Sequence, residues 1–319
     1  MDNIRNVTWD YARGIAITMI VLHHLYARFF ECTNARTDSI VYLCCYTMQL
    51  PIFMYVSGLL SRSSVVKNSF SSLLANRAIR LLLPFISFII IWFLIDSNRF
   101  ASVWANDFKD GYWFTFVLYE IIVIYAVLYF LSTAIKIRTI YLILVFWILL
   151  TIYKYYAGFF FVNRVLSINL VWHYCPFFFL GVYSNKLNLV IKRQFSILFL
   201  LIFMVSQYYY MNGHHFVLPI CNCSSLLFLL SIFVNGIRPA EKLFAMIGCY
   251  SLQIYLIHYF FRLYACQLPE IETPWIEFIL FMIMAFVVIF VSIAVSKLLM
   301  KSNILALVLF GVKKRIGII

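Results

Sequence analysis

The chain has 319 residues, of which 65% are hydrophobic and 12% charged, and its mean hydropathy is +0.95. Because a soluble domain carries about a quarter charged residues, this apolar mass exceeds what one aqueous core could bury and indicates lipid-facing surface. The net charge of +13 could suggest a nucleic-acid partner. However, the basic residues lie in short segments between apolar runs, so no nucleic-acid binding is expected.

Apolar runs long enough to cross a bilayer recur along the whole chain, about ten in all. They lie near residues 13–30, 39–60, 79–95, 112–132, 139–157, 166–184, 195–212, 216–234, 243–264 and 275–300. A short apolar stretch at 304–312 follows, which we expect to be an interfacial tail. The pattern predicts an all-α, polytopic membrane helix bundle that forms a single domain over residues 1–319.

The charged residues predict the orientation of this bundle. If the N-terminus is cytoplasmic, most of the 25 basic residues fall on the cytoplasmic side and most of the 12 acidic residues fall outside, as the positive-inside rule requires. Both termini are therefore predicted to be cytoplasmic. The eight cysteines are expected to be small apolar packing residues, and no ligand spacing indicates a metal site.

The first run carries two polar residues that a membrane helix holds only at a cost. Arg13 and His24 fall within about 20° of one helical face and about 16 Å apart along its axis. His23 points about 80° away from Arg13, so His24 is the candidate general base. His24 could instead only hydrogen-bond to a neighbouring helix. Arg13 could simply pair with Asp10, three residues before it.

Two further groups are candidates for chemistry. Arg77 and Arg80 repeat the three-residue spacing at the start of the third run, and arginine is the preferred residue for binding phosphate. The same residues would also satisfy ordinary positive-inside flanking. Glu120 lies inside the fourth run. It could be a catalytic group that orients or charges a histidine or arginine, or a protonated acid bonded to a tyrosine.

Candidate substrate contacts lie toward the outer ends of the runs. Trp113, His173 and His258 could stack on a sugar or bind its hydroxyl groups. For Trp113 and its counterpart Trp172, an aromatic belt at the membrane surface is the stronger alternative.

Several segments together resemble the acyltransferase-3 family of integral membrane acyltransferases. In chain order they are Asp10-x-x-Arg13-Gly with His24, Gln49 to Gly58, Arg77-x-x-Arg80 followed by Pro84, Tyr112-Trp113-Phe114, Pro176 to Gly181 and Ile247 to His258. The resemblance covers residues 5 to 300. Arg13, His24, Arg77 and Arg80 stand at the family's functional positions. The residue before the family's histidine is often small, and here it is His23, which leaves open which imidazole acts.

The resemblance implies that an acyl group, commonly acetyl, is transferred from cytoplasmic acyl-CoA to a hydroxyl of an envelope or surface glycan, or a lipid-linked sugar, on the outer side. The expected location is the bacterial cytoplasmic (inner) membrane, and a homo-oligomer is compatible with such a chain. The CoA phosphates would bind near Arg13, Arg77 and Arg80, and His24 would take the hydroxyl proton. A transporter or flippase for a sugar or lipid-linked glycan is the alternative function. A scaffold is less favoured, since buried polar groups are costly without a use.

Overall fold

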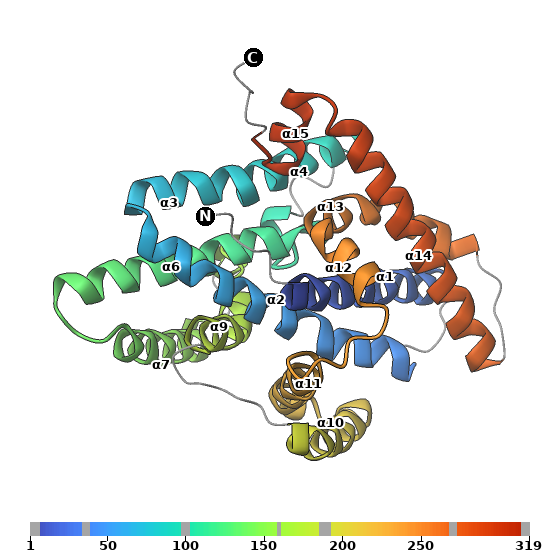
Figure 1. The fold of residues 1–319 in the computed structure, drawn as a ribbon, viewed down its shortest axis with the longest axis horizontal. Helices are drawn as coiled ribbons and strands as arrows, with labels where there is room; N and C mark the ends of the chain where they lie inside the picture. The colour runs from blue at the N-terminus through green and yellow to red at the C-terminus, as the bar shows by residue number, and fades with distance from the viewer. Residues whose placement is uncertain are drawn as a thin grey trace. The chain divides into compact units, whose positions relative to one another are not determined.

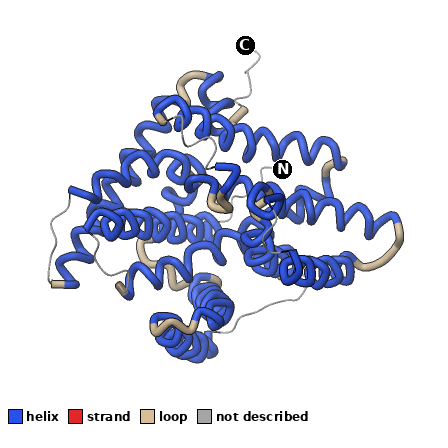
Figure 2. Tube along the Cα trace, turned by 180° about the vertical axis from the view of Figure 1, so that it is seen from behind, coloured by secondary structure: helices blue, strands red, loops and turns tan. Residues whose placement is uncertain are grey.

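The protein is described by a computed structural model that covers residues 7–33, 39–96, 103–157, 161–184, 193–267 and 273–313. Every regular element within these ranges is helical (Figure 2), which confirms the all-α prediction. Some charged residues that entered the orientation argument lie outside the described ranges. These are Asp2, Arg5, Arg36, Asp38, Arg99, Lys186, Lys192, Glu270, Glu272, Lys314 and Arg315.

Eight helices in the described part of the chain are long and apolar enough to cross a membrane, or nine if a bent pair counts as one span. The remaining predicted run forms a shorter apolar helix, so each predicted run is helical. In chain order the elements are α1 (Val7–Thr33), α2 (Ile40–Lys67), α3 (Phe70–Arg77), the π-helical turn η1 (Ala78–Leu82), α4 (Leu83–Ile95), the 3-10 turn η2 (Lys109–Gly111), α6 (Trp113–Ala134), α7 (Thr139–Ala157), α8 (Phe161–Val165), α9 (Ile168–Tyr183), η3 (Arg193–Phe195), α10 (Ser196–Met211), η4 (His215–Val217), α11 (Leu218–Phe233), α12 (Glu241–Cys249), α13 (Ser251–Phe261), the 3-10 turn η5 (Arg262–Gln267), α14 (Pro274–Leu299) and α15 (Asn303–Phe310).

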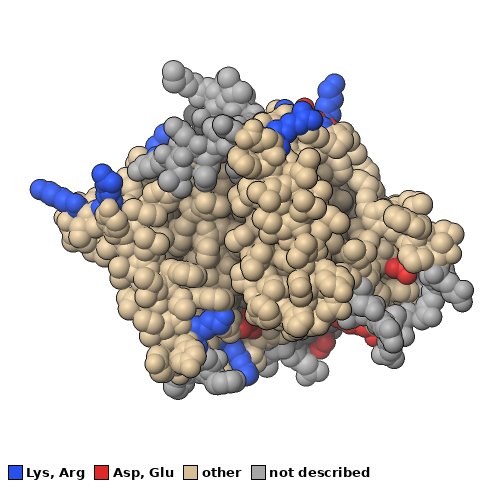
Figure 3. Space-filling view, turned by 90° about the horizontal axis from the view of Figure 1, so that it is seen from below, with Lys and Arg blue, Asp and Glu red and all other residues tan. Residues whose placement is uncertain are grey.

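The surface of these helices is suited to lipid. Large apolar side chains such as Ile148, Leu149 and Ile152 on α7 and Leu201 on α10 are exposed. Most of the described side chains in view in Figure 3 are uncharged. Because helices satisfy their own backbone hydrogen bonds, such a surface is stable in hydrocarbon. The chain is a polytopic membrane helix bundle.

The helices group into two compact units. The first consists of residues 1–56 and 185–298, and the second of residues 57–184 and 299–319. In the first unit, α12, α13 and η5 lie along α1 (Figure 1), and Tyr26 of α1 stacks on Phe281 of α14 with ring centroids 4.0 Å apart. Thr47 of α2 donates a hydrogen bond to Gln207 of α10 at 3.0 Å.

Two glycines bring α1 and α12 into backbone contact. A Cβ on Gly14 would overlap the carbonyl oxygen of Phe244, and a Cβ on Gly248 would overlap that of Asp10. Both glycines belong to segments that carry the family resemblance. Small residues of this kind let membrane helices approach closely, so this crossing sets where α12 and the chain after it lie against α1.

The chain bends by 81° between α12 and α13, at Tyr250. This break turns α13 so that it and η5 continue along α1 beyond the glycine crossing. Irregular backbone at membrane depth is tolerated where protein surrounds it. The break therefore shapes the interior of the first unit.

In the second unit, α15 packs against α4 and the π-helical turn η1. Ser87 of α4 donates a hydrogen bond to the carbonyl oxygen of Val308 at 2.9 Å, and Phe310 is fully buried. Gly311 ends α15 with φ +62°, and a Cβ there would overlap the carbonyl oxygen of Ile79. The segment expected to be an interfacial tail is therefore a helix that buries Ala306 and Phe310 and leaves Ile304 and Leu305 exposed.

Candidate active site

His24 lies on α1 against a second histidine from the bent pair. Its ring centroid is 5.3 Å from that of His258 and 5.5 Å from that of Tyr259. His24 is partly exposed, and none of the hydrogen bonds among the described residues involves its ring. A partly exposed imidazole with open nitrogens can accept a proton from a bound hydroxyl group.

The neighbouring His258 is buried and held in one tautomer. Its Nδ1 lies 3.0 Å from the carbonyl oxygen of Ile254, which can only accept, so Nδ1 carries the proton. The opposite nitrogen, Nε2, is buried and has no hydrogen-bond partner among the described residues. His258 therefore presents an open lone pair in the apolar interior next to His24.

His23 faces a different helix from His24. It is buried, its ring stacks on Tyr42 of α2 at 4.5 Å, and it lies 5.6 Å from the ring of Tyr46. Successive residues on a helix point about 100° apart, which is why the two imidazoles have separate surroundings. Nδ1 of His23 also lies 3.4 Å from the carbonyl oxygen of Tyr42, so His23 is occupied by α2, whereas His24 lies against His258 and Tyr259.

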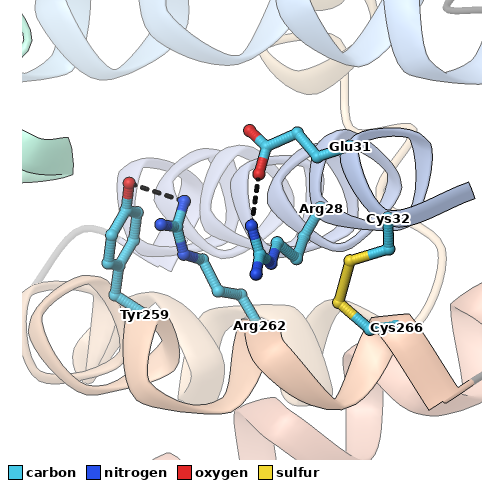
Figure 4. Close-up of polar contacts among 6 residues, drawn as sticks. All are labelled: Arg28, Glu31, Cys32, Tyr259, Arg262 and Cys266. Carbon is cyan, nitrogen blue, oxygen red and sulfur yellow. Dashed lines mark hydrogen bonds and ion pairs between the residues drawn. A yellow bond between two sulfur atoms is a disulfide. The ribbon is translucent and has the colours of Figure 1, made fainter. Parts of the chain in front are cut away.

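The His24–His258 contact is the first of three paired positions between α1 and the segment from α13 into η5. We call these three pairs the ladder. Both segments read His-x-x-x-Arg-x-x-x-Cys, as His24, Arg28 and Cys32 on α1, and as His258, Arg262 and Cys266 from α13 into η5. The last pair forms a disulfide with Cα atoms 5.6 Å apart. Figure 4 shows the disulfide and both arginines between the two segments. The expectation that every cysteine is an unbonded packing residue is therefore wrong for Cys32 and Cys266, whose ends of α1 and η5 are brought together by tertiary packing.

The opposite end of α1 carries the predicted arginine. Arg13 and Asp10 form an ion pair across one helical turn, and Asp10 also accepts a weak contact from the Cys249 thiol of α12 at 3.8 Å. The pairing proposed from the sequence is thus confirmed. One guanidinium atom, Nε of Arg13, is buried without a partner among the described residues.

Arg77 and Arg80 lie in the second unit, at the junction of α3 and η1. Arg80 is exposed and Arg77 is half-buried. Among the described residues no carboxylate pairs with either side chain. A π-helical turn is a local irregularity that often marks a functional site, and here it carries one of two adjacent unpaired guanidinium groups.

Glu120, on α6 of the second unit, has a buried oxygen, Oε2, with no partner among the described residues. No described hydrogen bond or ion pair joins it to a histidine, an arginine or a tyrosine. The cation that acts on it through space is Lys109. Lys109 is fully buried and donates to the backbone carbonyl oxygens of Asn106 and Arg164. Burial lowers the pKa of Lys109, and the carboxylates of Asp107 and Glu120 oppose this effect.

The candidate sugar contacts of the second unit are aromatic neighbours. Trp113 is buried and stacks on Tyr174 at 5.4 Å. The edge of His173 meets the same Tyr174 at 4.7 Å, and Trp172 is covered by the ammonium group of Lys154 at 3.5 Å. These contacts hold the rings in fixed positions, and His173 remains partly exposed.

The structure thus brings together His24 and His258, and separately Arg77 and Arg80. Sequence reasoning missed Arg28 and Arg262, the disulfide, and the glycine crossing. The repeated His-x-x-x-Arg-x-x-x-Cys spacing was the signal that could have revealed the two arginines and the disulfide. In the described residues no cluster of three or more potential metal ligands occurs.

These features define an all-α, polytopic membrane protein with a polar site built on its first helix. A family model described as an acyltransferase domain matches residues 6–295. The chain therefore belongs to the acyltransferase-3 family.

Two relatives are similar to part of this chain. The nodulation protein NolL of Mesorhizobium japonicum is 32% identical over 107 residues, which is 33% of this chain and 29% of the relative. The NolL protein of Sinorhizobium fredii is 30% identical over 102 residues, which is 31% of this chain and 27% of the relative. The chain thus matches less than a third of the length of each relative. No solved structure matches it.

Proposed function

We propose that this protein transfers an acyl group, most simply acetyl, from cytoplasmic acyl-CoA to a hydroxyl of an envelope glycan or lipid-linked sugar on the outer side of the bacterial inner membrane. The observation that carries the proposal is His24, which is partly exposed, has no hydrogen-bond partner among the described residues, and lies against His258 in a chain of the acyltransferase-3 family.

The disulfide supports the sidedness of this proposal. Disulfides persist in oxidising compartments and are rare in the cytoplasm. The Cys32 end of α1 is therefore assigned to the outer side, and the Arg13 end to the cytoplasm. The N-terminus would then be cytoplasmic, and with ten predicted spans the C-terminus as well, as the charge distribution also favours. His24, eight residues from Cys32, lies about 12 Å from the disulfide end along the axis.

The donor phosphates are assigned to Arg13, Arg77 and Arg80. Arg77 and Arg80 fit phosphate because both guanidinium groups lack a carboxylate partner among the described residues. Arg13 already pairs with Asp10 but keeps a buried Nε that has no partner in the described part of the chain. Guanidinium groups bind phosphate through paired hydrogen bonds, so each would contribute charge and orientation to donor binding.

His24 would remove the proton from the acceptor hydroxyl while the hydroxyl oxygen forms a bond to the carbonyl carbon of the thioester. The carbon–sulfur bond then breaks, and His24 returns the proton to the departing CoA thiolate. His258 would orient the acceptor through its open Nε2. Glu120 remains a candidate catalytic residue, since its buried Oε2 has no partner among the described residues. Trp113 and His173 remain candidates for acceptor contacts.

A sugar or lipid-linked glycan transporter is the second candidate. The observation that favours it is the bent pair α12–α13, because transporters place broken helices around substrate sites at the membrane midplane. Transport moves the glycan without consuming a thioester, so the two functions have different products.

The test uses the full chain in sealed vesicles with acetyl-labelled acetyl-CoA and a glycan acceptor on opposite sides. We expect labelled acceptor from the wild type. In H24A we expect a fall in rate of about a hundredfold or more, as removal of a general base gives, while H23A should retain activity. Glycan movement without label transfer would favour transport. Full activity in H24A would overturn the assigned base.

A further inference from the structure

The ladder between α1 and η5 places two arginines next to the proposed base. Arg28 and Arg262 each lie four residues beyond a histidine of the pair and four before a cysteine of the disulfide. Four residues rise about 6 Å along a helix. Because both ends of the ladder are in contact, the two guanidinium groups between them must also lie near one another, as Figure 4 shows.

Arg262 has most of its hydrogen-bonding capacity open. Its guanidinium group lies 3.9 Å above the ring of Tyr259, and one nitrogen donates to the Tyr259 hydroxyl at 2.8 Å. No carboxylate pairs with it among the described residues. Stacking on an aromatic ring fixes the plane of a guanidinium group and leaves its edge for an anion.

Arg28 is only partly neutralised. It pairs with Glu31 at 2.8 Å, at the exposed rim, and its Nε is buried without a partner among the described residues. A second carboxylate lies on the neighbouring helix α14. This is Glu277, which is hydrogen-bonded to Tyr26 of α1. Two like charges held close together in a partly buried place repel each other unless an anion lies between them.

We infer that Arg28 and Arg262 bind an anionic group of the acceptor, either the carboxylate of an acidic sugar or a phosphate of a lipid carrier. The inference rests on the proposed function, because it places this anion about one helical turn from His24. That separation is comparable to the width of a sugar ring, so a hydroxyl on the same or the adjacent ring would reach the imidazole. The acceptor class is then an anionic glycan, and the arginine pair selects for it.

The test compares three acceptors that share the same neutral sugar hydroxyls. They are a neutral trisaccharide of N-acetylglucosamine, an oligosaccharide of equal length that contains glucuronic acid, and the neutral trisaccharide linked to undecaprenyl diphosphate. The full chain is used in phosphatidylcholine nanodiscs, which carry no net lipid charge. The KM for acetyl transfer and the equilibrium affinity are measured for each acceptor.

We expect at least one anionic acceptor to have a KM about tenfold or more below that of the neutral trisaccharide, as a charge-assisted pair of hydrogen bonds allows. A preference for glucuronate would identify a sugar carboxylate, and a preference for the diphosphate would identify the carrier. R262Q and R28Q should each reduce this preference, and R262K should retain part of it. R164Q removes an exposed arginine of the second unit and serves as the charge-matched control.

Equal KM values for neutral and anionic acceptors, or an unchanged preference in R262Q, would overturn the inference while leaving acyl transfer intact. If the wild type transfers to none of the three but binds the anionic ones in a manner that depends on Arg262, the proposed function fails and the anion site stands. Absence of both transfer and anion binding in the wild type would overturn both.

Discussion

The ring centroids of His24 and His258 are 5.3 Å apart, and Nε2 of His258 is buried with no hydrogen-bond partner among the described residues. The carbonyl of Ile254 fixes this arrangement, because it occupies the Nδ1 proton of His258. The structure therefore distinguishes two proposed roles, a general base at His24 and a residue that orients the acceptor at His258. His24 is partly exposed and forms no hydrogen bond with the described residues, whereas His258 is held by Ile254 and can accept one hydrogen bond from a bound molecule.

Replacing His258 with Asn tests this division. Asn is polar but has no nitrogen lone pair at the position of Nε2. The hydrogen bond that Nε2 would accept from the acceptor is therefore lost. We expect kcat/KM for the acceptor to fall about tenfold to a hundredfold, with donor affinity unchanged. Steady-state kinetics in nanodiscs provide the measurement, and H23A, whose ring lies against Tyr42, is the control. Wild-type kinetics in H258N would remove His258 from the site.

Substitution of the crossing glycines should damage the fold. In G14A or G248A the new methyl group would overlap a backbone carbonyl of the facing helix, and backbone cannot move aside without separating α1 from α12. We expect a loss of about 1–3 kcal/mol or more in stability, as overpacking produces. Thermal unfolding in detergent is the readout.

Gly213, in the turn after α10, offers a matched control for the crossing glycines. It has φ +87°, and a methyl group added there would meet no other atom within 4 Å. G213A therefore suffers only the modest strain of a left-handed alanine. If G14A and G248A unfold no earlier than G213A, close contact at this crossing is not required.

The disulfide should protect two of the eight cysteines from maleimide. In the unreduced protein, denatured before labelling, we expect Cys32 and Cys266 to remain unlabelled and the other six to react. C32S, C266S and the double variant should lose similar stability, about 2–4 kcal/mol, because each opens the same long loop. Labelling of all eight residues without reductant would contradict the bond and the outer assignment of this end of α1.

The donor arginines should respond to charge reversal and to displacement of the helix that supports them. R77E or R80E should raise the KM for acetyl-CoA about tenfold or more, since each removes and reverses a phosphate contact. G311V should raise it less, because the added side chain would push α15 away from the backbone of Ile79 and Arg80. I304A, at an exposed position of the same helix, should leave it unchanged. If R77E and R80E bind acetyl-CoA as tightly as the wild type, the donor phosphates do not bind at Arg77 and Arg80.

The helical segments were predictable because their apolar length is a local property. Each predicted run corresponds to a helix, including the pair that divides at the His214–Val217 turn. The ion pair between Asp10 and Arg13 was predictable for the same reason, since three residues on one helix are neighbours whatever surrounds them. The packing of residues 304–312 on α4 was not predictable, because apolarity alone does not say which side chains of a short helix contact protein.

The amino-acid sequence alone thus determined the helices, their membrane character and the shared face of Arg13 and His24, because these follow from composition and the pitch of one helix. Only the tertiary structure decided that His24 rather than His23 lies against His258, that Cys32 bonds to Cys266, and that Arg28 lies opposite Arg262. Those relationships join residues more than 200 positions apart. They depend on the close approach of α1 and α12 and on the bend after Cys249, which no local pattern encodes.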